Sequence, residues 1–155
     1  MDLRLVEHLS AGCMGWYVCK KGDGFAALEP IAMSLMKGYG SVERGAAQGL
    51  FLRMDPGTQY LSDYFHKRIE VGGIAPRFDF LVQPQTKGVA EHFLRMLQEQ
   101  AIYGRGFDTI EDVRRAVAEF LELYNNEWLI EKNGYLNSSR QAREAYYASE
   151  VEAAA

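Results

Sequence analysis

The chain has 155 residues, of which 48% are hydrophobic, and a formal net charge of −4. This length suits one globular domain, and the hydrophobic share is enough to build a core. The sequence has no run of about 18 apolar residues that could cross a membrane, and its first residues lack the pattern of a secretory signal. We therefore expect a cytoplasmic protein with no membrane partner. The negative charge counts against a surface that holds DNA unaided.

Cysteine and histidine usage argues against a disulfide and against a zinc site. The two cysteines, Cys13 and Cys19, are six residues apart. If both lie on one strand, about 3.3 Å per residue separates them by roughly 20 Å, whereas a disulfide needs Cα atoms within about 7 Å. The three histidines are scattered and no CxxC pair is present, so zinc ligation is not expected.

Strand and helix patterns alternate along the chain. Apolar runs bounded by turn residues predict strands at 3–9, 14–20, 50–54 and 78–82, the first two forming a hairpin. Apolar residues at helical spacing predict helices at 25–37, 60–70, 89–103 and 110–124, with a short final helix starting near residue 138 or 139. Gly38 and Gly40 should end the first helix, and residues 84–88 should break the chain.

Two further features complete the expected organisation. Thr109 and Asp112 have the spacing of a helix capping box. We predict one mixed α/β domain over residues 1–150 and a frayed tail over 151–155.

Two carboxylates occupy positions that favour a site. Asp55 follows a predicted buried strand, and Glu91 is predicted one turn into a helix; 35 residues lie between them. The spacing alone carries no weight, because 21 acidic residues give roughly two such pairs by chance. Local interpretations also remain open. Asp55 would then cap a turn, and Glu91 would be a first-turn acid stabilised by the helix dipole or paired with Arg95 at i+4.

The residues around both acids resemble a known enzyme family. Residues 52–65 read LRMDPGTQYLSDYF and residues 83–99 read QPQTKGVAEHFLRMLQE. They resemble the second and third acidic motifs of bacterial insertion-sequence transposases and retroviral-type integrases, the DDE family, which has the same 35-residue spacing. Residues 107–128 resemble that family's helix ending in YN-x-x-W, residues 134–136 its closing G-Y motif, and residues 6–15 its early strand-turn-strand.

This resemblance implies a ribonuclease H-like mixed sheet flanked by helices. It also implies DNA transposition or integration by phosphoryl transfer with Mg²⁺ or Mn²⁺. Asp55 and Glu91 would be catalytic metal ligands, and Lys87 and Arg95 would contact DNA. The family acts on transposon ends and target DNA and works as multimers, so a homo-oligomer is implied.

The chain departs from the family pattern in several places. The family's first catalytic aspartate lies on a central strand before the region that matches residues 6–15, so we expect residues 1–155 to lack that strand and to be inactive alone. Glu7 falls on the hairpin and is not expected to replace the missing acid. Lys87 and His92 stand where the family has Asn and Arg. The alternatives are a non-catalytic remnant that serves as an oligomerisation or interaction module, and a soluble α/β domain without activity.

Overall fold

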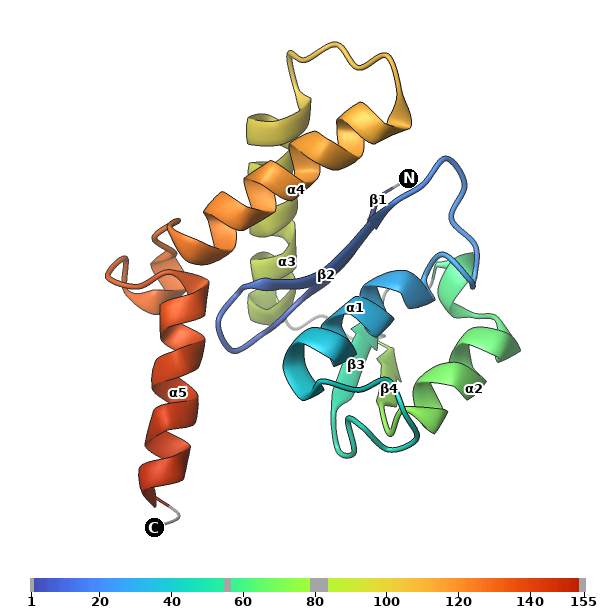
Figure 1. Cartoon of the computed structure of the whole chain (residues 1–155), viewed down its shortest axis with the longest axis vertical. Helices are drawn as coiled ribbons and strands as arrows, with labels where there is room; N and C mark the ends of the chain where they lie inside the picture. The colour runs from blue at the N-terminus through green and yellow to red at the C-terminus, as the bar shows by residue number, and fades with distance from the viewer. Residues whose placement is uncertain (1, 55–56, 79–83, 154–155) are drawn as a thin grey trace. The chain divides into compact units, whose positions relative to one another are not determined.

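The computed structural model describes residues 2–54, 57–78 and 84–153, and they form two compact units (Figure 1). The first unit comprises residues 1–5 and 14–83, and the second comprises residues 6–13 and 84–155. Strands and helices occur together, so the predicted α/β class is confirmed. Within the parts described, no helix is long and apolar enough to span a bilayer.

The chain begins with the predicted hairpin. Strands β1 (Asp2–Val6) and β2 (Cys13–Val18) pair as a two-stranded sheet. At the turn the Glu7 amide donates to the Gly12 carbonyl at 2.8 Å, and Ala11 has a left-handed backbone with φ of 58°. Both cysteines are buried, and no disulfide joins them.

The first unit packs two helices with a short parallel sheet. Its elements are α1 (Leu28–Tyr39), β3 (Phe51–Met54), a 3₁₀ turn η1 (Thr58–Tyr60), α2 (Asp63–Val71) and β4 (Ala75–Phe78). Strands β3 and β4 are parallel, with Phe51 opposite Ala75 and Met54 opposite Phe78. Parallel neighbours need a crossover, which α2 supplies. The core of this unit consists of Ala27, Ile31, Leu35, Ala47, Leu52, Met54, Phe65, Ile69 and Ile74.

Local signals explain where α2 begins and ends. The Ser62 hydroxyl accepts a hydrogen bond from the Phe65 amide at 3.2 Å and so caps the first turn. Gly72 caps the other end, and Gly73 follows with φ of 86°, a conformation that glycine adopts readily. The helix expected at 60–70 thus ends at these two glycines.

The second unit is helical. It contains α3 (Pro84–Leu97), which continues into a π-helical turn η2 (Gln98–Ile102), then α4 (Ile110–Asn126), a 3₁₀ turn η3 (Glu131–Asn133) and α5 (Ser139–Ala153). Phe93 of α3 packs against Phe120 and Tyr124 of α4, with ring centroids 6.5 and 4.9 Å apart. These aromatic rings anchor α3 on α4.

The start of α3 corrects one prediction. Residues 84–88 were expected to break the chain, but α3 begins at Pro84 and includes Gly88. Proline is well placed at the first helical position, where its missing N–H needs no partner, and one glycine inside a helix costs only about 1 kcal/mol.

Three other boundaries differ from the prediction. The strand expected at 78–82 is found earlier, as β4, and residues 79–83 lie outside the described part of the chain. Gly38 lies within α1, and Gly40 caps it instead. Helix α5 continues through Ala153, so residues 151–153 of the expected tail are helical.

Candidate functional site

The second acidic motif lies where β3 ends. Strand β3 finishes at Met54, whose side chain is buried, and Asp55 is the next residue. Residues 55 and 56 themselves lie outside the described part of the chain, so the role predicted for Asp55 stays a prediction.

Glu91 lies on the exposed face of α3. Its side chain is exposed, whereas Phe93 and Leu97 of the same helix are fully buried. Because α3 starts at Pro84, Glu91 is about two turns into the helix rather than one. The helix dipole acts mainly within the first turn. Stabilisation by the dipole therefore does not explain an acid at this position.

Lys87 and Arg95 share a row with Glu91. The three residues follow one another at four-residue intervals on α3, and this spacing places them along one helix face. The Lys87 side chain lies outside the described part. Arg95 is exposed, and its guanidinium lies 3.2 Å from His92 Nδ1. The alternative in which Arg95 pairs with Glu91 is therefore not what the structure has.

The contact between Arg95 and His92 has a defined direction. A guanidinium nitrogen can only donate a hydrogen bond, so Nδ1 of His92 is the acceptor in this contact. The sequence alone did not indicate this pairing.

The Glu7 carboxylate interacts with two side chains of the second unit. Its carboxylate lies 3.2 Å from the Arg143 guanidinium of α5 and accepts a hydrogen bond from the Ser10 hydroxyl at 2.6 Å. Both oxygens of the Glu7 carboxylate thus have partners within the second unit. Among the described residues, no three His, Cys, Asp or Glu side chains are grouped so that they could hold a metal ion.

Comparison with known proteins relates the sequence to a transposase and the fold to an integrase core. No family model matches the sequence. The chain is 21% identical over 145 residues to the transposase for insertion sequence element IS629 of Shigella sonnei, covering 94% of this chain and 46% of that transposase. Its fold superposes on the catalytic core domain of BIV integrase with a TM-score of 0.60 and 19% identity, covering 81% of this chain and 83% of that domain.

The chain is a distant relative of the DDE transposases, with the fold of an integrase core. The family resemblance noted in the sequence is therefore confirmed, together with the ribonuclease H-like fold. This integrase-like chain spans about half the length of the curated transposase it matches. The roles of Asp55, Glu91, Lys87 and Arg95 are not tested by these likenesses and stay predictions.

Sequence reasoning also missed a pocket of about 200 Å³ in the second unit of this integrase-like core. Tyr124 and Trp128 are four residues apart, a spacing that places two aromatic rings on one side of the chain. That spacing was the one indication of the pocket that the sequence offered.

Proposed function

We propose that residues 1–155 form part of a DDE transposase core in which Asp55 and Glu91 are two of the carboxylates that hold Mg²⁺ or Mn²⁺. The observation that carries this proposal is the position of Glu91. It is an exposed carboxylate on α3, and no described side chain forms an ion pair with it. The relationship to an insertion-sequence transposase supports the same function.

The donor set fits a hard divalent cation. Mg²⁺ and Mn²⁺ prefer oxygen ligands, and an exposed carboxylate can turn toward an ion without first breaking a salt bridge. Asp55 and Glu91 would hold the ion. When bound, such an ion lowers the pKa of a water or hydroxyl nucleophile and stabilises charge on the phosphodiester.

Lys87 and Arg95 are proposed to position DNA. Both belong to the row of α3 that carries Glu91, one turn before and one turn after it. Cationic side chains on either side of a metal-binding carboxylate would bind the phosphates that flank the reacting one. Transposon ends and target DNA are the proposed partners, and DNA in a bacterial cell implies a cytoplasmic location.

We further propose that residues 1–155 lack the first strand and the first catalytic carboxylate, and that they are inactive alone. In the described residues β1–β2 and β3–β4 are two separate pairs rather than one continuous sheet. A strand between such pairs would join them. Two carboxylates also neutralise less of the charge on a pair of divalent ions than three would.

A second candidate function is a non-catalytic interaction or oligomerisation module. In the described residues β3 and β4 form a two-stranded sheet, and the edges of such a sheet are where a strand of another chain can pair. Self-association through these edges would give the proposed homo-oligomer. Sedimentation of the 155-residue chain over a concentration series distinguishes a monomer from such an assembly.

Mn²⁺ titration followed by NMR tests the metal site. Paramagnetic Mn²⁺ should broaden amide signals around Glu91 and around Asp55 at the same concentration. Glu91→Gln removes a charged ligand while keeping the shape of the side chain, and should weaken the broadening at both places by about tenfold. Glu99→Gln, a change at another exposed acid in the turn that follows α3, should leave it unchanged.

Two results would refute the metal assignment. One is broadening spread over acidic residues throughout the chain, without preference for residues 55 and 91. The other is an equal effect of Glu91→Gln and Glu99→Gln. Either result, combined with sedimentation that depends on protein concentration, would favour the interaction module.

A further inference from the structure

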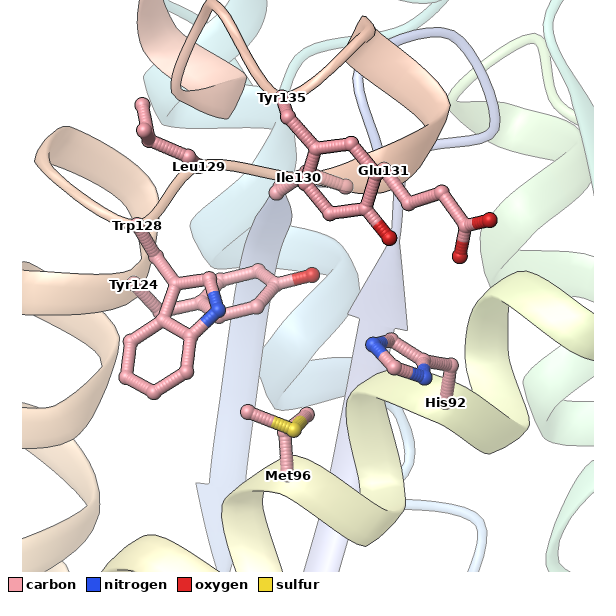
Figure 2. A pocket seen from close by; sticks show the side chains of 8 residues that line it. All are labelled: His92, Met96, Tyr124, Trp128, Leu129, Ile130, Glu131 and Tyr135. Atoms are coloured by element: carbon pink, nitrogen blue, oxygen red, sulfur yellow. The ribbon is translucent and has the colours of Figure 1, made fainter.

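The pocket in the second unit lies between α3, the end of α4 and the segment that follows α4. Its volume is about 200 Å³. An engineered cavity of about 150 Å³ accommodates a molecule the size of benzene, so this pocket can hold a small organic ligand. Figure 2 shows Tyr135 and Glu131 on one side and Met96 and His92 of α3 on the other, with Tyr124 and Trp128 beside them.

Aromatic rings dominate the lining. Tyr124, Trp128 and Tyr135 border the pocket, and the Tyr124 and Trp128 ring centroids are 6.5 Å apart with planes inclined by 31°. The thioether of Met96 and two aliphatic side chains add polarisable, apolar surface. The face of an aromatic ring carries partial negative charge and attracts cations.

Charge in the lining is negative. Glu131 is the acidic residue of the lining, and no Lys or Arg belongs to the lining set. The guanidinium of Arg95, which is not part of the lining, lies 3.2 Å from Nδ1 of His92. The adjacent Lys132 is engaged elsewhere: its ammonium donates to the Leu9 carbonyl at 3.0 Å and lies 3.2 Å from His8 Nδ1.

Tyr135 is held over the pocket by an unusual backbone. Its φ is 57°, in the left-handed region that residues other than Gly, Asn and Asp seldom adopt. Its backbone amide donates a hydrogen bond to the Ile130 carbonyl at 3.1 Å. The residue is nevertheless 59% exposed, and its hydroxyl forms a side-chain hydrogen bond with Glu131 of the lining. Strain of this kind concentrates at ligand sites.

We propose that this pocket binds a small methylated ammonium cation, with the rings of Tyr124, Trp128 and Tyr135 around the methyl groups and the Glu131 carboxylate as counter-ion. The Glu131 carboxylate interacts with the Tyr135 hydroxyl, which offers it no positive charge, so a purely apolar ligand would leave the charge uncompensated and an anion would be repelled by it. A methylated ammonium matches both features, because it carries its charge on an apolar surface.

The test compares choline with 3,3-dimethyl-1-butanol, its uncharged analogue of the same shape. Binding to the 155-residue chain is followed through the indole N–H signal of Trp128 in NMR spectra. The indole signal of Trp16, in the first unit, serves as an internal reference. Choline should shift the Trp128 signal saturably and bind at least about threefold more tightly than the neutral analogue.

Variants separate charge from shape. Glu131→Gln should weaken choline binding about three- to tenfold and leave the neutral analogue unchanged. Glu127→Gln, at an exposed acid outside the lining, should change neither. Tyr135→Phe keeps the ring and should keep binding, whereas Tyr135→Leu should reduce it. Equal binding of choline and the neutral analogue, or an unchanged Trp128 signal with both, would overturn the proposal.

Discussion

The side chains of Tyr124 and Asn125 attach the hairpin turn to α4 within the second unit. The Asn125 amide accepts from the Cys13 N–H and donates to the Cys13 carbonyl, both at 2.9 Å, and thereby imitates a neighbouring strand. The Tyr124 hydroxyl donates to the Ala11 carbonyl at 3.2 Å. Burial, with a smaller contribution from Cys13, raises the pKa of Tyr124 to about 12, so this donor stays protonated at neutral pH.

These anchoring contacts could not be predicted from the sequence. Tyr124 and Asn125 were recognised only as part of a family-like motif, and their partners lie more than 110 residues earlier in the chain. Periodicity shows that Tyr124 faces a core. It does not show which distant carbonyl its hydroxyl reaches.

The capping box of α4, by contrast, was predicted from two residues and is confirmed. The Asp112 carboxylate accepts from the Thr109 hydroxyl at 2.6 Å and from the Thr109 amide at 3.0 Å, and the Asp112 amide donates to the Thr109 hydroxyl. These hydrogen bonds, the side-chain one first, lower the pKa of Asp112 below its usual 3.8.

The lowered pKa predicts acid sensitivity. A carboxylate whose pKa falls on folding stabilises the native state above the pKa of the unfolded chain, and this contribution disappears as the pH falls through the lower native value. Urea unfolding between pH 6 and pH 2 should therefore show a loss of stability in the acid range that Asp112→Asn reduces. Asp108→Asn, at an exposed acid outside the capping box, is the control; an identical pH profile for both variants would contradict the assignment.

At the scale of elements, two glycines have opposite environments. Gly15 lies in β2, and a Cβ atom there would overlap the Pro30 carbonyl of α1 and approach the Ser34 hydroxyl at 2.5 Å. The close approach of strand and helix thus depends on the missing side chain. Gly88 lies inside α3, and a Cβ there would meet no atom within 4 Å.

Replacing each glycine by alanine should change stability in opposite directions. Gly15→Ala should destabilise the first unit by about 1–3 kcal/mol, because backbone must move to admit the methyl group. Gly88→Ala should stabilise α3 by about 0.5–1 kcal/mol, since alanine loses less entropy in a helix. Denaturant unfolding of the two variants measures both effects, and a stable Gly15→Ala protein would show that α1 does not approach β2 so closely.

At the scale of the whole molecule, most elements followed from local patterns. The hairpin, the strand before Asp55 and the existence of the four main helices followed from apolar spacing, and Thr109, Gly72 and Ser139 mark helix ends. The start of α3 was wrong, because Pro84 and Gly88 read as breakers in isolation, whereas contacts of Phe93 and Leu97 support the whole helix.

The candidate site was only partly predictable. Lys87, Glu91 and Arg95 are spaced four residues apart, so the sequence predicts that they share one face once a helix is assumed. The contact between Arg95 and His92, and the pocket around Trp128, depend on side-chain rotamers and on contacts between segments, which spacing does not specify.

The overall charge predicts weak DNA binding by these residues alone. With a net charge of −4, the 155-residue chain should bind a random duplex no more tightly than micromolar at about 0.15 M salt, as measured by fluorescence anisotropy. In low salt, Arg95→Gln should weaken binding about two- to fivefold, and Arg140→Gln, at an exposed arginine of α5, should have little effect. Equal losses would mean that α3 is not the DNA-contacting face.

The parallel pairing of β3 with β4 has a consequence for the order of folding. No tight turn can bring these strands into register, and the chain between them contains α2. Loop closure is less costly once that intervening segment has shortened into a helix. We therefore expect the β3–β4 ladder to form late in folding, after α2.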